Sequence, residues 1–546
     1  MINRLLSFAI LALLVAVPAS AQTSRLVDPL DPSYLELQQL VDAGLIDRVS
    51  LGQRPVSRAA FARALDQAAA RLGAGKTNTP RRAVFYRELV STLQERLHLG
   101  DSLSMNAELP SRFALLRTAS LDATRTDQPT RLIPSDNGLG NIDGWINSML
   151  ENRQGRALVE GLTTTLETTH ALETKHVALA LTPHLSIIDA IGAAARVSAR
   201  LQEAQFRLLS KNLALDIGRE YLVWGQGRDG GLLNSNNSPP LDLIKLSSEQ
   251  PFYLPWFLHG FGPTRLAIFY ADLGVDQNFP HAHLIGYRAN IAPFSALDLG
   301  VSVYTKSGGR GAPRATLTAR LIDLLPFLDA SAYNNAFGTR GHFEFSDHYA
   351  GFDGRLRLRP LGSSFYWDVL MNDFDVRRLR SVLWEDAGHV FGLDLPPLSP
   401  SGRLRASVEY HHTGIRYYEH QQFLSGQTVH HVLTGDPLGP DAQGGYAHLD
   451  WYKSASIRAG LHFAVERRSN DQYAYIPEPN FGFRKTEERP KEWQARVLAE
   501  VQLLPSVRQF GTFVQFGYQR TRNFDFVEGN GRNSFLGRAT ISYRLQ

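Results

Sequence analysis

The stretch "IRAGLHFAVE", residues 457–466, switches between apolar and polar side chains at nearly every step. Its odd-numbered positions are all apolar, whereas its even-numbered positions include Arg458, His462 and Glu466. Successive side chains of a β-strand point to opposite faces, so a period of two predicts a strand with one apolar and one polar face. Such a strand separates an oily environment from a wet one.

The same alternation recurs in many segments that follow residue 103. It is found at residues 193–201, 356–360, 403–410, 493–502, 514–518 and 535–545. These segments run to about ten residues, the length of a tilted membrane strand, whereas soluble strands average about five or six. Only helices and closed barrels can satisfy every backbone polar group in lipid. We therefore predict an all-β transmembrane β-barrel of about 16 to 18 antiparallel strands over residues 103–546.

The first residues have the layout of a cleaved export signal. Arg4 provides a positive start, residues 5–17 are apolar, and Ala19 and Ala21 flank a small-residue cleavage site. We predict a signal peptide over residues 1–21 and a location in the outer membrane. The chain has no cysteine, so neither a disulfide nor a lipid anchor on cysteine is expected.

Residues 22–102 have helical periodicity. Ser57 is placed as an N-cap, and Pro32 and Pro80 stand at first-turn positions. We expect a small, water-facing helical segment in the periplasm. Residues 34–70, with "YLELQQLVDAGLID" and "GQRPVSRAAFARALDQA", resemble one S-layer-homology repeat. Such modules bind cell-wall polymers, so this resemblance implies a periplasmic cell-wall polymer as a further partner.

Composition and motifs exclude several classes of function. A net charge of +4 over 546 residues, with no basic run, gives no support for nucleic-acid binding. We found no nucleophile elbow, zinc-protease motif or phosphate-binding loop, so we predict that the chain is not an enzyme and needs no cofactor. The histidine pairs at 281 and 283, 411 and 412, and 430 and 431 lack metal-ligand spacing, and no metal site is predicted.

The polar faces of the predicted strands are rich in arginine. They carry Arg196, Arg200, Arg355, Arg357, Arg359, Arg403, Arg405, Arg458 and Arg496, with Glu409, Glu466 and Glu500 beside them. These residues either brace the barrel as an arginine–carboxylate network or attract acidic sugars, since guanidinium pairs well with carboxylates.

One run departs from the strand pattern: "VWGQGRDGGLLNSNNSPP", residues 223–240. We place Trp224 near the end of a strand, in the aromatic girdle at the membrane interface. A connection of nearly forty residues, 225–262, then follows, and its second half, "EQPFYLPWFLHGFG", is aromatic. Loops of this length without periodicity are usually functional, so we predict a folded, plug-like loop at the barrel mouth.

At this run the chain resembles the Wzi family of capsule assembly proteins. The matching residues are Trp224-Gly225-Gln226-Gly227-Arg228-Asp229-Gly230, then Ser235-Asn236-Asn237 and Pro239. The resemblance implies an outer-membrane barrel of about 18 strands with a helical periplasmic part. It also implies a surface lectin that holds capsular polysaccharide on the cell exterior.

We therefore predict a lectin-like barrel that attaches capsular or extracellular polysaccharide to the cell surface, with outer-membrane lipid as its surroundings. The candidate polysaccharide-binding or plug residues are Trp224, Arg228, Asp229, Asn234, Asn236, Asn237, Tyr253 and Trp256. Arg228 and Asp229 either contact sugar or only anchor the loop. The alternative function is a general or sugar-selective porin, whose lumen arginines would set ion preference.

Overall fold

The computed structural model describes most of the chain. The described residues are 23–47, 49–75, 80–97, 112–134, 137–147, 149–313, 346–372, 384–476, 482–504 and 509–545. The predicted signal peptide lies outside them. No helix among these residues is long and apolar enough to cross a membrane.

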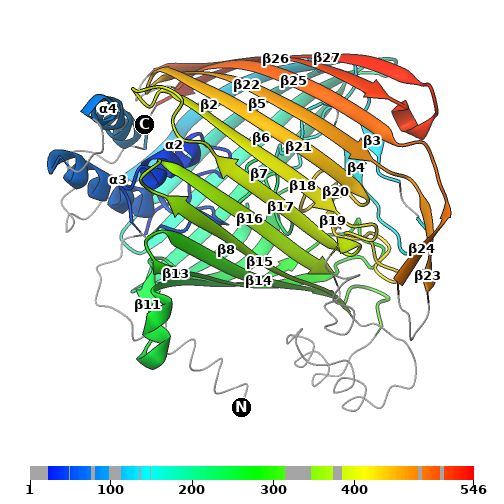
Figure 1. Cartoon of the computed structure of the whole chain (residues 1–546), viewed down its shortest axis with the longest axis horizontal. Helices are drawn as coiled ribbons and strands as arrows, with labels where there is room; N and C mark the ends of the chain where they lie inside the picture. Colours follow the sequence, from blue (N-terminus) through cyan, green and yellow to red (C-terminus); the bar gives the residue numbers. More distant parts are fainter. Residues whose placement is uncertain are drawn as a thin grey trace.

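Eighteen long strands form one closed antiparallel barrel, which confirms the predicted fold class (Figure 1). Strands β2 and β27 close it, with Leu121 opposite Ile541. The strands are β2 (Arg112–Thr126), β5 (Gly161–Glu173), β6 (Val177–Ala190), β7 (Arg196–Ser210), β8 (Leu213–Glu220), β10 (Leu241–Ser248), β12 (Pro263–Asp272), β13 (His283–Phe294), β14 (Leu297–Ser307), β15 (Ser346–Leu358), β16 (Ser363–Asn372), β17 (Ala387–Asp394), β18 (Leu404–Thr413), β21 (Ala442–Ser454), β22 (Ile457–Arg468), β25 (Glu492–Leu503), β26 (Phe510–Arg522) and β27 (Gly531–Arg544).

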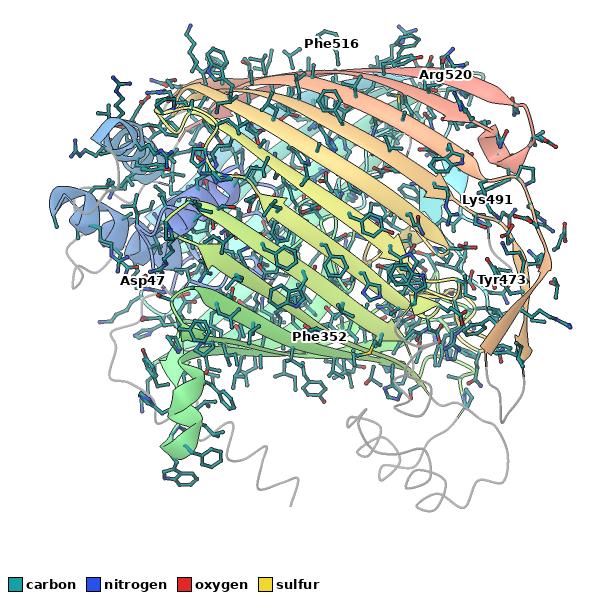
Figure 2. All side chains as sticks on the ribbon, viewed as in Figure 1. Asp47, Phe352, Tyr473, Lys491, Phe516 and Arg520 are labelled. Atoms are coloured by element: carbon teal, nitrogen blue, oxygen red, sulfur yellow. The ribbon has the colours of Figure 1, made fainter. Side chains whose placement is uncertain are left out.

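The alternation in the sequence separates the two faces of the wall. In β6, Leu181, Leu185 and Ile187 are exposed on the outside, whereas Thr182 and His184 are buried on the lumen side. Figure 2 shows the same outward orientation for the side chains of Phe352 and Phe516, which are both exposed. A protein in water would not leave a continuous apolar band exposed, so this outer face is the lipid-facing surface.

The two ends of the barrel differ. Helices α3 (Arg58–Gly73) and α4 (Pro80–Arg96) lie at one end, together with the C-terminus (Figure 1). We call this the helical end; tight turns such as the one between β13 and β14 also lie there. The described parts of the longer connections at 127–160, 221–240, 414–441 and 469–491 lie at the opposite end, which we call the loop end.

Part of the helical segment is buried in the barrel rather than exposed to water. Ser57 caps α3 as predicted, because its side chain accepts a hydrogen bond from Ala60 N. However, α2 (Ser33–Asp42) is buried on nearly every side, and its apolar core includes Tyr452 of the barrel wall. Gln39 Nε2 donates to Tyr452 Oη at 3.0 Å. The expectation of a bundle exposed to water is therefore wrong for α2, which occupies the barrel mouth.

The region predicted as one loop, 225–262, is instead divided by a barrel strand. Strand β10 pairs with β8 on one side and β12 on the other. Prolines on both sides of this strand hid it, and so did its inward-facing Leu241 and Leu243. The first half of the region therefore lies at the loop end, and the aromatic second half lies at the helical end.

Candidate functional site

After β8 ends at Glu220, the chain turns into the lumen rather than forming an external loop. The short strand β9 (Val223–Trp224) pairs antiparallel with β1 (Gln53–Arg54) from the N-terminal segment. Gly225 N also donates to Gly52 O at 2.8 Å. The motif and the N-terminal segment thus form a joint plug inside the barrel; we call residues 221–240 the lumen plug.

Trp224 does not lie in a membrane girdle, and that prediction was wrong. Its side chain is 1% exposed and its ring packs against Phe269 at 5.3 Å and Tyr304 at 5.1 Å. The strand leaves the wall at Glu220, so the indole is carried into the lumen. Trp224 is part of the apolar core that fills the barrel near the loop end.

Two wall carboxylates bind the backbone of the plug. Asp368 on β16 accepts from Gln226 N at 2.9 Å, and Glu409 on β18 accepts from Arg228 N at 2.5 Å. Glu409 also accepts from Asp229 N at 3.0 Å. Backbone N–H groups that converge on one carboxylate form a strong, charge-assisted anchor.

The glycines of the motif make this close approach possible. Gly225 has a φ of +124°, and a Cβ there would lie 2.5 Å from Asp368 Oδ2. At Gly227 a Cβ would meet the carbonyl oxygen of Gly230 at 1.8 Å. A side chain at Gly225 would push the plug off Asp368, and one at Gly227 would disrupt the turn of the plug itself.

Arg228 ends in a chain of ion pairs on the wall. Its guanidinium lies 2.9 Å from Asp450, which also pairs with Arg458 at 3.4 Å. Arg458 in turn pairs with Glu500 at 2.7 Å. The positive charge of Arg228 is therefore matched within the lumen.

Asp229 joins two histidines that face each other across a strand pair. His448 and His462 are register partners on β21 and β22, and their rings stack at 4.1 Å. Asp229 Oδ2 lies 2.6 Å from His448 Nε2, and Asp229 Oδ1 lies 3.1 Å from His462 Nε2. Burial raises the pKa of Asp229, but the two imidazoles outweigh it and hold this pKa well below its ordinary range.

These three side chains are also the group among the described residues that could hold a metal ion. Two imidazoles and a carboxylate are a ligand set that suits Zn²⁺ or Fe²⁺. The sequence prediction of no metal site remains untested. The pairing of His448 with His462 was missed because it depends on the hairpin register rather than on spacing along the chain.

The asparagines of the motif mostly support the backbone. Trp224 N donates to Asn234 O at 3.1 Å, and Asn237 Nδ2 donates to Leu433 O at 3.0 Å. Both asparagines are buried. Asn236 lines a cavity of about 280 Å³, which also borders α2, Arg228 and Asp229.

The structure does not bring Tyr253 and Trp256 to this site. They lie at the helical end, 43% and 73% exposed, because β10 crosses the barrel between them and the motif. The prediction that Tyr253 and Trp256 belong to the same site as the motif residues is therefore wrong.

Seven of the nine predicted lumen arginines lie in ion pairs, whereas Arg196 is exposed at the start of β7 and Arg200 donates to Gly155 O. Arg355, Arg357, Arg405, Arg458 and Arg496 are buried, and their partners are Asp394, Asp298, Asp42, Glu500 and Glu466. Burial and the nearby Asp394 raise the pKa of Asp42 on α2, against the guanidinium groups of Arg355 and Arg405. This arrangement favours the interpretation that these arginines brace the barrel over the interpretation that they bind acidic sugars.

A small cap covers the loop end. Strands β3 (Arg131–Leu132), β4 (Trp145–Ile146), β19 (Thr428–Val429) and β20 (Val432–Leu433) form its four-stranded sheet. Ile133, Val429 and Leu433 from the cap share one apolar core with Trp224. This core fills the lumen between the cap and the plug.

The turn between β19 and β20 is His430-His431, and both rings are about half exposed. Both residues have left-handed backbone, with φ of 49° and 61°. His430 Nδ1 lies 2.8 Å from Asp276, and His431 Nδ1 lies 2.9 Å from Asp143. Two-residue turns of this kind favour asparagine and glycine, so histidine at both positions costs backbone strain.

Comparisons with known proteins agree with this architecture. An uncharacterised 55.8 kDa protein from the cps region of Klebsiella pneumoniae is 30% identical over 166 residues, which are 30% of this chain and 31% of that protein. The match therefore covers about a third of the length of the Klebsiella protein. Among solved structures, Escherichia coli Wzi, described as an outer-membrane, carbohydrate-binding β-barrel involved in group 1 capsule assembly, has a TM-score of 0.65 at 17% identity. The match covers 96% of this chain and 100% of that one.

A second solved structure, OprD of Pseudomonas aeruginosa, has a TM-score of 0.41 at 10% identity, over 80% of this chain and 97% of that one. The family model described as capsule assembly protein Wzi matches residues 101–534, which is most of the chain. The chain thus belongs to the Wzi family of capsule assembly proteins.

Proposed function

We propose that this protein holds polysaccharide at the cell exterior and does not conduct solutes through its lumen. It is an outer-membrane β-barrel of the Wzi family. The observation that carries the proposal is that both ends of the lumen are filled. The α2 core occupies the helical end, and the core around Trp224 occupies the loop end.

This filling argues against the porin alternative. Conduction needs a continuous wet path, and the described lumen contains apolar side chains next to Trp224, Tyr417 and Tyr418 under the cap. Two cavities remain in the described part of the lumen, one of about 280 Å³ between α2 and the plug and one of about 470 Å³ beside β2, β26 and β27. Both are lined by paired charges, such as Arg228 with Asp450 in the first and Arg538 with Asp122 in the second. A binding role, rather than catalysis, fits this arrangement.

In this proposal the motif residues support the cap rather than touch the sugar. Ion pairs or hydrogen bonds to other residues in the lumen hold Arg228, Asp229, Asn234 and Asn237. The side chain of Trp224 is buried. The polysaccharide contact then lies on the outer surface of the cap, which the plug holds in place.

We place that contact at the His430-His431 turn. Each ring is about half exposed, and its Nδ1 is held by an aspartate. Nε2 of each ring can then accept from a sugar hydroxyl, or donate to an acidic sugar when the imidazole is protonated. Backbone strain at an exposed turn is most readily explained by the side chains that it presents.

The test compares polysaccharide on cells with polysaccharide in the medium. In a strain that lacks the gene, we expect synthesis to continue and the polysaccharide to be released. Wild-type protein should restore retention, whereas the His430→Ala/His431→Ala variant should not. The matched control is His281→Ala, which removes another exposed histidine–aspartate pair. Cells that keep their polysaccharide without the gene would refute the proposal.

A periplasmic cell-wall polymer remains a second proposed partner of residues 34–70. The resemblance to an S-layer-homology repeat supports it, but much of that segment packs in the α2 core, including Tyr34, Leu37 and Phe61. The exposed sides of α3 and α4 would have to make this contact. Binding of purified peptidoglycan to the protein, compared with a chain that begins after α4, would test it.

A further inference from the structure

An uncharged aromatic segment projects from the helical end of the barrel. Residues 251–262, between β10 and β12, contain no Asp, Glu, Lys or Arg. Their side chains are nevertheless exposed: Trp256 is 73%, Phe257 85% and Phe261 45% accessible. A patch of this kind in a soluble environment normally marks an interaction surface.

The segment has a defined fold. Its first part, β11 (Phe252–Tyr253), pairs with β12, and Phe252 is buried. Its second part is the helical turn η1 (Trp256–Phe261), and the ring of His259 on η1 stacks on the ring of Tyr253 on β11 at 4.6 Å. Gly262 N donates to His259 O at 3.0 Å and closes the turn. The exposed rings are therefore held in place by an ordered scaffold.

Gly262 sets the direction in which this scaffold leaves the wall. Its φ is +72°, and a Cβ there would lie 2.1 Å from Ala292 O on β13. Glycine thus lets η1 lie against the end of β13. Figure 1 shows η1, the green helix beside the label β11, pointing away from the barrel axis and beyond the outer side of the wall.

This position is continuous with the lipid-facing surface. Phe294, at the end of β13, is an exposed ring on the adjacent edge. Tryptophan, tyrosine and phenylalanine are favoured where the hydrocarbon meets the headgroups. A helical turn that projects sideways from the rim lies along the plane of that interface rather than across it.

We propose that η1 and its exposed rings form a membrane foot, seated in the phospholipid leaflet at the helical end of the barrel. Trp256, Phe257 and Phe261 insert their rings between lipid headgroups and acyl chains. The foot fixes the depth and tilt of the barrel at the end that carries the helices. A docking site for a soluble protein would be expected to combine apolar residues with a charged rim, and this segment has no charged residue.

The test uses the absence of native cysteine in the chain. The full chain with Phe257→Cys is labelled with a nitroxide and reconstituted in phosphatidylcholine vesicles. Collisions with oxygen, which dissolves in lipid, are compared with collisions with a water-soluble nickel complex. The matched control is Glu487→Cys, an exposed position in the hairpin of β23 (Gln472–Ile476) and β24 (Gly482–Glu487).

We expect the oxygen-to-nickel collision ratio at residue 257 to exceed that at residue 487 by about tenfold, since the first probe lies in lipid and the second in water. Equal ratios would overturn the proposal. Disulfide cross-linking of two copies of the unlabelled Phe257→Cys variant in dilute vesicles would also overturn it, in favour of a second copy of the chain as the occupant.

A second variant gives an independent readout. The fluorescence that Trp256→Phe removes should be quenched more by lipids brominated close to the headgroup than by lipids brominated near the chain end, by about twofold. Quenching by aqueous iodide alone would overturn the proposal. Neither outcome bears on polysaccharide retention, so this proposal and the proposed function stand or fall separately.

Discussion

The Glu409 carboxylate on the barrel wall accepts the backbone N–H of Arg228 at 2.5 Å. The same carboxylate accepts from Asp229 N, from Tyr366 Oη at 2.6 Å, and lies 2.9 Å from His411 Nε2. A single wall residue therefore holds the centre of the glycine-rich motif through its backbone. This explains why the motif needs glycines more than any one side chain.

We predict that Glu409→Gln weakens the plug. Replacing the charged acceptor removes charge-assisted hydrogen bonds, and the loss should be about 2–3 kcal/mol. The temperature at which the folded band disappears on gels should fall. The matched control is Glu500→Gln, which alters a lumen ion pair with Arg458 without touching the motif backbone.

The plug also predicts an electrical result. Wild-type protein in planar bilayers should show no steady open channels, because cores at both ends fill the lumen. The double variant Asp368→Ala/Glu409→Ala removes both backbone anchors and should show opening events. Large, steady channels in the wild type would favour the porin function instead.

Trp224→Ala should be among the most damaging single changes in the lumen. It removes a buried indole that packs on Phe269 and Tyr304, and such truncations cost about 3–5 kcal/mol. Trp224→Phe should cost less, because it leaves a smaller cavity. Trp451→Phe on the lipid-facing surface is the control and should leave the unfolding temperature nearly unchanged. An equal loss of stability in Trp224→Phe and Trp451→Phe would contradict the position of Trp224 in the core.

Asp229→Ala separates anchoring from sugar contact. The change leaves His448 and His462 without their shared carboxylate, so we expect a destabilisation of about 3 kcal/mol. Cells carrying the variant should retain polysaccharide as long as the barrel stays folded. A fully stable barrel that loses retention would instead make Asp229 a direct contact.

The buried pair of Arg58 on α3 and Glu173 on β5, 2.6 Å apart, should control docking of the helices. Breaking a buried ion pair costs about 3–5 kcal/mol, since one charge is left behind. Glu173→Ala should therefore expose the N-terminal segment to trypsin in detergent. Glu487→Ala, which removes an exposed pair with Arg489, should change cleavage little.

The barrel could be predicted from the sequence because each strand reports its own two faces. The period of two at 457–466 is a local signal, and so is the N-cap of helix α3 at Ser57. Strand β10 was missed because its lumen face carries Leu241 and Leu243, which pack on the plug rather than face water. Local alternation cannot reveal that part of a lumen is dry.

The functional site was only partly accessible for a related reason. The motif residues could be singled out by composition, but their partners could not. Asp368 and Glu409 look like any polar residue on a lumen face, and His448 meets His462 only through hairpin register. Trp256 was assigned to the wrong end because a strand in between was counted as loop.

We propose that the closed barrel holds polysaccharide through the cap. The most direct measurement is binding of the purified, detergent-solubilised protein to capsular polysaccharide from the cell that carries the gene, immobilised on a sensor surface. We expect saturable binding by the wild type and by His281→Ala, and at least a tenfold loss, about 1.4 kcal/mol, in His430→Ala/His431→Ala. Failure of the folded wild-type protein to bind that polysaccharide would contradict the claim.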